Sequence, residues 1–158
     1  MSDRPETNSI WDEIEGNNFA VLGMVTARHQ ARTVGIVDVV DGHRLYIGTG
    51  RDQWKSKHIA QTGDVSMTIP IPNRVPLMPW IKIPAATITF SGTAHVLEAD
   101  QLETALFDKL HRHDAERTGW RAIEVTPNGH FVTYGIGVSL LEMRHPDRAR
   151  ARVPVEVG

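Results

Sequence analysis

The sequence predicts a mainly β protein, an antiparallel split barrel of six or seven strands, of the Greek-key type, with short helices at its flanks. Runs of apolar and β-branched residues recur between short turn-forming segments. Asp41-Gly42 separates two such runs, which is a strong hairpin signal because both turn positions favour positive φ. Strands and helices do not alternate regularly, which argues against a doubly wound parallel sheet. The expected strands cover residues 19–27, 33–40, 44–49, 65–69, 85–97, 120–126 and 132–140.

Helix boundaries in the first half follow from capping residues. Ser9 is the expected N-cap of a helix that ends at Gly16, with Asp12 as a capping-box variant. Asp52 is the expected N-cap of a second helix over residues 53–62, and Gly63 is its stop. Residues 70–84 then carry five of the nine prolines, which predicts an irregular excursion rather than a central strand.

The second half is expected to contain two strands around a further helix. Gly92 predicts a bulge or bend in the strand over 85–97. Asp100 is the expected N-cap of an amphipathic helix that continues to about Arg117, with Glu103 completing a capping box. Pro127-Asn128-Gly129 predicts a turn before the strand over 132–140, in which apolar and small or polar residues alternate.

Composition limits the classes of function. The 158 residues fit one domain, and the net charge of −2 argues against a general nucleic-acid binder, which needs a basic surface. The chain has no cysteine, so thiolate chemistry and disulfides are excluded. No apolar run is long enough to predict a membrane span, and the acidic N-terminal residues do not fit a signal peptide. We therefore expect a cytoplasmic protein without a membrane or nucleic-acid partner.

The segment from Tyr46 to Ile59 is the most informative for function. A strand ends in Gly48-Thr49-Gly50, and the predicted helix begins directly after it. Arg51, Lys55 and Lys57 lie at this helix start, where positive charge is locally unfavourable unless an anion binds there. The segment therefore indicates a phosphate site. A solvated, lysine-rich helix start remains the alternative interpretation.

Residues 19–69 resemble the flavin-binding split barrel of the pyridoxamine 5′-phosphate oxidase-like superfamily, in the order of their strands and helix. The resemblance implies that the corner between strand and helix holds the phosphate of FMN. Lys55 agrees with the family pattern, whereas Trp54 stands where an arginine is usual and Gln53 where a serine is usual, and Arg51 is a candidate to compensate. The implied cofactor-binding residues are Arg32, Thr33, Val34, Ile47, Gly48, Thr49, Arg51, Gln53, Trp54 and Lys55.

The resemblance also implies an activity. We expect a flavin-dependent oxidoreductase that binds FMN in a homodimer groove and transfers hydride to or from a small organic substrate. The alternatives are an F420-dependent reductase of the same fold and a non-catalytic flavin- or haem-binding protein. The C-terminal sequence HPDRARARVPVEVG lacks the tryptophan of the classical vitamin B6 oxidases, which argues against that activity. The expected organisation is a helical segment over 1–16, an FMN-binding barrel over 17–145 and a tail over 146–158.

Other candidates have two interpretations each. Trp80 is either a lid over the ring or a dimer contact, unless it packs on its own chain. His58 is more typical of a structural histidine than of a catalytic one. His111 and His113 lie two positions apart on the predicted helix, on different faces, so no metal site is expected. The arginines between 144 and 152 form either a solvated tail or a contact with a phosphorylated substrate. No residue is identified as catalytic.

Overall fold

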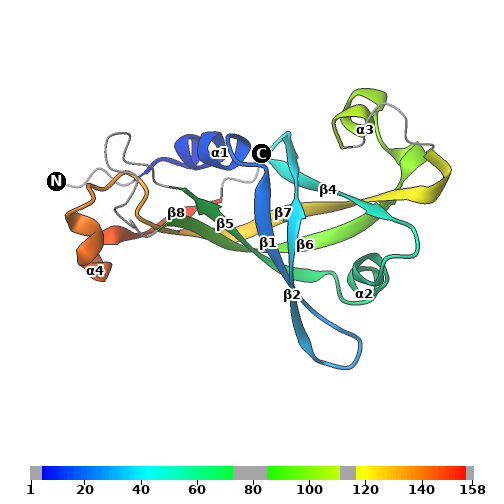
Figure 1. Ribbon diagram of the computed structural model, residues 1–158, viewed down its shortest axis with the longest axis horizontal. Helices are drawn as coiled ribbons and strands as arrows, with labels where there is room; N and C mark the ends of the chain where they lie inside the picture. The colour runs from blue at the N-terminus through cyan, green and yellow to red at the C-terminus, as the bar shows by residue number, and fades with distance from the viewer. Residues whose placement is uncertain (1–4, 73–84, 111–116, 156–158) are drawn as a thin grey trace.

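The computed structural model describes residues 5–72, 85–110 and 117–155 of the chain. Its strands form one antiparallel sheet with short helices around it, as the sequence predicts (Figure 1). The elements in chain order are α1 (Thr7–Glu15), β1 (Phe19–Val25), β2 (Ala31–Val37), β3 (Val39–Asp41), β4 (Arg44–Gly50), α2 (Trp54–Thr62), β5 (Asp64–Ile71), β6 (Ala86–Glu98), η1 (Ala99–Gln101), α3 (Thr104–Leu110), η2 (Arg117–Gly119), β7 (Trp120–Tyr134), η3 (Glu142–Arg144), α4 (Pro146–Ala149) and β8 (Arg150–Pro154).

The order of the strands explains why the sheet curls. Hydrogen-bonded neighbours follow the order β2-β1-β5-β6-β7-β4-β3, so β2 and β3 lie at opposite ends of this path. Only Asp38 separates these two strands in the sequence. Two ends of a sheet that are joined by one residue must lie close together, so the sheet bends into a barrel. The expected strand over 33–40 is therefore two strands, with the interruption at Asp38.

Strands β6 and β7 are the longest described strands and connect the two halves of the sheet. β7 pairs with β6 on one side. On its other side it pairs first with β4 and then, from His130 to Tyr134, with β8. The register between β6 and β7 shifts between Thr89 and Ser91, opposite Val132 and Asn128, which places extra residues on β7. Gly92 itself lies where an added Cβ would come within 2.8 Å of the Thr126 carbonyl oxygen, so its role is a close approach of two backbones.

The core fills the curled sheet and is closed at one end by α1. Ile10, Trp11 and Ile14 are the buried residues of this helix. The Trp11 ring meets the Phe131 ring edge-on, and Phe131 meets Phe90 in the same way. A second apolar cluster joins α3 and the residues before it to the outer side of β4 and β7; its buried members are Tyr46, Ala99, Leu102, Leu106, Phe107 and Ala122.

Three of the expected helix caps are wrong. α1 begins at Thr7, so Ser9 lies inside the helix, where its hydroxyl donates to the Glu6 carbonyl oxygen at 2.7 Å. α2 begins at Trp54 with Gln53 at the N-cap, one residue after Asp52, and no side chain caps it. Glu98, not Asp100, caps the turn η1, in a capping box with Gln101. Both helix stops are in the expected places, Gly16 and Gly63, and Gly63 has a φ of 69°.

The expected helix over 100–117 is interrupted. After η1 the backbone of Leu102 is extended, and α3 begins only at Thr104. Residues 111–116, which include both candidate histidines of this region, lie outside the described residues. Leu102 and Leu106 are buried as the apolar spacing predicts. The prediction of a continuous helix is therefore wrong, although the predicted apolar residues Leu102 and Leu106 are buried.

The expected turn at 127–129 and the strand over 132–140 are wrong in their boundaries. β7 continues through Pro127-Asn128-Gly129, because the extra residues are accommodated by the register shift. The strand ends at Tyr134 because Gly135 and Gly137 have φ values of 75° and 69°. The alternating pattern therefore indicated a strand beyond its true end. The sequence analysis also missed β8, which pairs with β7.

The predicted hairpin forms, whereas the first proline of residues 70–84 belongs to a strand. Asp41 pairs with Arg44, and the two loop residues Gly42 and His43 both have positive φ, so the hairpin is confirmed with its loop one residue later than Asp41-Gly42. β5 continues through Pro70 to Ile71, so the irregular excursion does not begin at residue 70. Residues 73–84, with Trp80, lie outside the described residues. Among the described helices, none is long and apolar enough to cross a bilayer.

Candidate functional site

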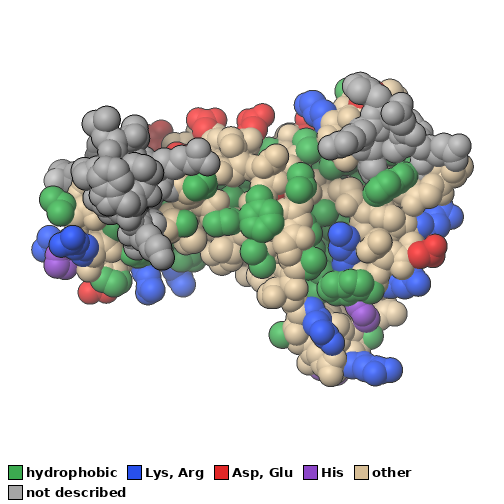
Figure 2. All heavy atoms as spheres, viewed as in Figure 1, with side chains coloured by type: hydrophobic (Ala, Val, Ile, Leu, Met, Phe, Trp, Pro, Cys, Tyr) green, Lys and Arg blue, Asp and Glu red, His purple; other side chains and the backbone are tan. Residues whose placement is uncertain are grey.

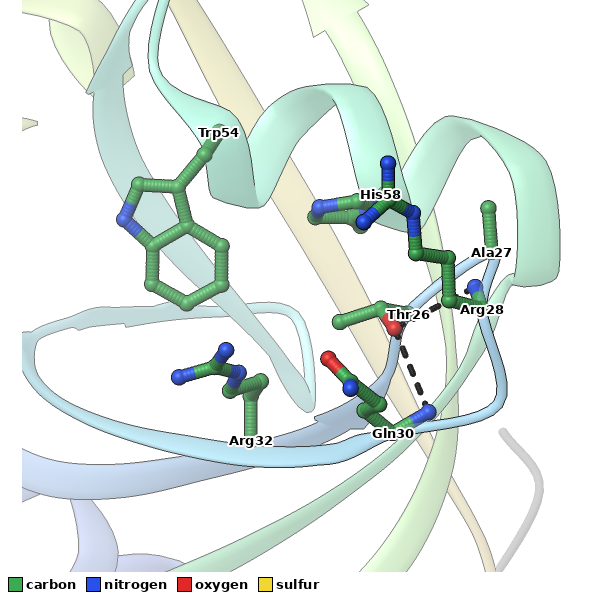
Figure 3. A pocket seen from close by; sticks show the side chains of 7 residues that line it. All are labelled: Thr26, Ala27, Arg28, Gln30, Arg32, Trp54 and His58. Carbon is green, nitrogen blue, oxygen red and sulfur yellow. Dashed lines mark hydrogen bonds between the residues drawn. The ribbon is translucent and has the colours of Figure 1, made fainter.

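A pocket of about 550 Å³ lies between α2 and the turn that joins β1 to β2 (Figure 3). This hairpin projects from the sheet beside α2 in Figure 1, and Figure 2 shows several lysine and arginine side chains around it. The β1–β2 hairpin forms one wall of the pocket, and α2 forms the opposite wall. The lining residues are Thr26, Ala27, Arg28, Gln30, Arg32, Trp54 and His58.

Thr26 fixes the shape of the hairpin wall. Its backbone N–H donates to the Gln30 carbonyl oxygen at 2.9 Å, and its buried hydroxyl accepts the backbone N–H groups of Arg28 at 3.3 Å and Gln30 at 3.2 Å. His29 takes a φ of 58° within this closed turn. The turn is therefore held by hydrogen bonds among its own residues, and Figure 3 shows Arg28, Gln30 and Arg32 on its pocket side.

The helix wall consists of Trp54 and His58, one turn apart on α2. Trp54 is 41% exposed, although tryptophan side chains are on average highly buried. The two rings lie 6.0 Å apart between centroids and are tilted by 60°. His58 Nδ1 is buried and has no hydrogen-bond partner among the described residues. The pocket thus contains a flat apolar surface beside an unsatisfied ring nitrogen.

The start of α2 adjoins this pocket through Trp54, its first residue. No side chain caps the helix, so its first backbone N–H groups are not satisfied by a cap. Lys55 is half-buried here and makes no ion pair with the described residues. An uncapped helix start with a nearby ammonium group is suited to a phosphate.

One of the three predicted cations at this corner is already paired. The Arg51 guanidinium lies 2.8 Å from Glu98, which also pairs with Arg121 at 2.8 Å. These contacts hold the pKa of the Glu98 carboxyl below its ordinary value, with the hydrogen bond from Arg121 as the largest cause. Lys57 is exposed on α2 and makes no such pair with the described residues. The positive charge at the corner is therefore smaller than the sequence suggests.

The other predicted site residues of this region belong to β4 rather than to a loop. Gly48, Thr49 and Gly50 pair with Ala122, Arg121 and Trp120 of β7. The Thr49 side chain is only 2% exposed, and its hydroxyl lies 3.5 Å from the Gly50 carbonyl oxygen. Ile47 is a buried core residue. These positions shape the corner through their backbone, and the predicted contact of the Thr49 hydroxyl with a phosphate stays a prediction.

Arg32, Thr33 and Val34 lie on β2, on the same hairpin as the pocket. They pair with Met24, Gly23 and Leu22 of β1. Arg32 and Thr33 are exposed, and Arg32 lines the pocket together with Trp54. The fold therefore brings together two of the ten predicted residues in the pocket, while Gln53 and Lys55 flank Trp54 along the chain.

Sequence reasoning missed most of the hairpin wall. It assigned residues 28–31 only to a turn, and it gave Thr26, Ala27, Arg28 and Gln30 no role in a site. A usable signal was present, since two arginines lie four positions apart across a turn. In residues 5–72, 85–110 and 117–155, no group of three or more histidine and acidic side chains is placed to hold a metal ion.

Comparison with known proteins places this geometry in a fold. No protein-family model and no curated protein matches the sequence. Among solved structures, a candidate pyridoxamine 5′-phosphate oxidase from Listeria innocua superposes with a TM-score of 0.60 at 15% identity, over 77% of this chain and 92% of the other. An F420 reductase has a TM-score of 0.55 at 16% identity, over 76% and 93%. A haem storage protein from Vibrio cholerae superposes with a TM-score of 0.57 at 11% identity, over 81% of this chain and 94% of the other.

These similarities identify the class of fold. The chain has the split-barrel fold of these structures, which is the fold that the resemblance in residues 19–69 implies. At 10–16% identity the likeness shows the fold alone. The ligand and the reaction have to be argued from this chain's own residues.

Proposed function

We propose that this protein is a flavin-dependent oxidoreductase that binds FMN between the start of α2 and the β1–β2 hairpin. The observation that carries the proposal is the pocket of about 550 Å³ beside an uncapped helix start, with an exposed indole between them. This volume lies in the ordinary range for cofactor sites, roughly 300–1,000 Å³. FMN combines a phosphate with a flat ring, and these two features require a cationic corner and an apolar surface.

The chain's residues divide these tasks. Lys55 and the first N–H groups of α2 bind the phosphate, since a charge-assisted hydrogen bond to an anion is shorter and stronger than a neutral one. Trp54 packs against the ring and excludes water from one side of it, and the backbone of β2 from Arg32 to Val34 lies along the ring's edge. When bound, the flavin supplies hydride transfer with a small organic substrate, and the protein orients both partners.

A homodimer is part of this proposal because the pocket is open on the side away from its two walls. An apolar patch formed by Phe19, Val21 and Val37 lies on β1 and β2, the strands that form the hairpin wall. Phe19 is 48% and Val37 63% exposed, and they pair with each other in the register. Figure 2 shows hydrophobic side chains gathered over the middle of this face. Phe19 and Val37 lie at the end of the two strands opposite the turn, so a second copy that covers the patch must extend along the hairpin to reach the pocket.

A second candidate is an F420-dependent reductase. Two arginines of the pocket, Arg28 and Arg32, make no ion pair with the described residues, and F420 carries more acidic groups than FMN. Direct competition separates the two candidates. Tighter binding of F420 than of FMN by the purified protein favours the second, and the reverse order favours the first. Flavin that binds but is never reduced by NAD(P)H or reduced deazaflavin favours a non-catalytic binding protein.

The decisive variant is Lys55→Ala. If Lys55 binds the phosphate, FMN affinity falls by about 1.5–3 kcal/mol, while riboflavin, which lacks the phosphate, binds as before. Lys57→Ala is the matched control, because Lys57 is a lysine of the same helix and is exposed. Titration followed by flavin fluorescence measures both. An equal effect of the two variants on FMN would refute the proposed phosphate corner.

A further inference from the structure

The pocket is positively charged without a balancing acid. Arg28 and Arg32 line it, and no aspartate or glutamate is among its lining residues. The whole chain has two more acidic than basic residues, so this local excess of cations is not a consequence of composition. Neither arginine makes an ion pair or a side-chain hydrogen bond with the described residues. The pocket therefore presents guanidinium groups that are available to an anion.

The two arginines are held on one rigid turn. The hydrogen bonds of Thr26 fix the backbone of Arg28 and Gln30, and β2 pairing fixes Arg32 opposite Met24. Figure 3 shows Arg28 beside His58 and Arg32 below Trp54, with Gln30 between them. A fixed backbone reduces the entropy that is lost when a ligand orders these side chains. Both arginines therefore start from defined backbone positions on one wall of the pocket.

The opposite wall adds ring contacts. Trp54 offers an exposed indole face, and His58 has a buried ring nitrogen, Nδ1, without a partner among the described residues. Guanidinium groups bind carboxylate or phosphate oxygens through paired hydrogen bonds, and aromatic rings stack on flat organic molecules. Together these groups match a molecule that has both a ring and an acidic group.

We infer that the part of the pocket formed by Arg28, Gln30 and His58 binds the acidic group of a flat organic anion, which is the substrate of this protein. The inference rests on the proposed function only in naming this ligand the substrate of a flavin reaction. The acidic group, a carboxylate or a phosphate, lies at Arg28, and the ring of the ligand lies between His58 and the flavin ring, which keeps the indole face of Trp54 and the backbone of β2. The flavin phosphate remains at the start of α2, on the other side of Trp54.

Three small probes test the inference by calorimetric titration of FMN-free and FMN-loaded protein. They are 2-naphthoate, 2-naphthyl phosphate and the neutral 2-naphthalenemethanol. We expect at least one anion to bind about 10-fold or more tightly than the neutral probe, because a hydrogen bond to a charged group is strong. The stronger of the two anions identifies the acid. Equal affinity of all three probes would overturn the inference.

Variants locate the charge that is responsible. Arg28→Gln removes the preference for the anion and leaves the neutral probe unchanged, whereas Arg28→Lys keeps part of the preference and shows that the turn still folds. Arg152→Gln is the matched control, because Arg152 is an exposed arginine of β8 that does not line the pocket. An equal loss in Arg152→Gln would place the anion on the C-terminal segment and overturn the inference.

The FMN-loaded arm separates this inference from the proposed function. Anion binding that is retained after loading supports a substrate site beside the cofactor. Anion binding that disappears on loading overturns the inference, because the pocket then belongs to the flavin itself. A protein that binds the anions through Arg28 but never binds FMN would refute the flavin function and leave the anion site standing.

Discussion

The Trp11 indole lies parallel to the His43 imidazole, with 4.9 Å between the ring centroids and 7° between the ring planes. Trp11 comes from α1, and His43 is a loop residue of the β3–β4 hairpin with a φ of 60°. This contact joins the N-terminal helix to a hairpin next to the point where the barrel closes. A residue of a surface turn therefore covers a buried tryptophan of the core.

Removal of this stacking should weaken the protein without deforming the turn. His43→Asn removes the ring but keeps a residue that tolerates positive φ, so we expect a loss of about 0.5–1.5 kcal/mol in the free energy of unfolding. Urea denaturation measures this loss. In a double-mutant cycle with Trp11→Leu, His43→Asn should cost less than it does alone, because its partner is gone. Strictly additive effects would contradict an energetic contact between the two rings.

Asp38 should make stability depend on pH. Both of its carboxylate oxygens are buried without a partner among the described residues, and desolvation raises its pKa from the ordinary 3.8 to about 6. Between these two pH values the unfolded chain has lost the proton that the folded chain keeps. The contribution of Asp38 to the free energy of unfolding is therefore most favourable below about pH 4. It falls by about 2–3 kcal/mol as the pH rises through 6.

Asp38→Asn removes this titration. The free energy of unfolding of the variant minus that of the original protein should rise from pH 4.5 to pH 7.5. Urea denaturation at both pH values measures this difference. Other carboxyl groups titrate in both proteins and cancel in the difference. A stability difference that is the same at both pH values would show that Asp38 ionises in the folded protein as readily as in the unfolded chain.

Glu98 should limit anion binding at the start of α2. It pairs with both Arg51 and Arg121, so Glu98→Gln releases Arg51 beside the proposed phosphate corner. Glutamine can still accept the hydrogen bond that caps η1. We expect FMN to bind about 2–5-fold more tightly to this variant at low salt, with the gain lost at high salt because exposed charges are screened. An Arg51→Gln, Glu98→Gln double variant should lose the gain, and its persistence would exclude Arg51 as the cause.

The apolar patch should hold the proposed homodimer together. Val37→Lys places a charge on the most exposed member of the patch and should convert a dimer to a monomer, as measured by sedimentation at micromolar concentration with cofactor. Leu141→Lys is the control, since Leu141 is an exposed apolar residue outside the patch. A protein that is monomeric before any substitution would contradict the proposed dimer.

Local structure was largely predictable from the sequence. The Asp-Gly hairpin, the helix stop at Gly63 and the apolar run that forms β1 depend on neighbours along the chain, and each was predictable for that reason. Boundaries were less predictable, because the end of β7 and the pairing of β8 depend on which strand lies alongside. The expected helix over 100–117 is interrupted before Thr104, and residues on both sides of the break pack on β4 and β7.

The site, in contrast, depends on contacts between segments that are distant in the sequence. The curled sheet brings the turn at Arg28 opposite Trp54 and His58, although these segments lie about 30 positions apart and share no pattern. It also brings Glu98 to Arg51, which lies 47 positions away in the sequence. This ion pair reduces the net positive charge at the start of α2, which the sequence analysis counted without Glu98. Electrostatic and stacking contacts act through space over a few ångströms. The sequence determines which side chains are present. The bending of the sheet into a barrel, with β2 and β3 joined at Asp38, determines which of them come into contact.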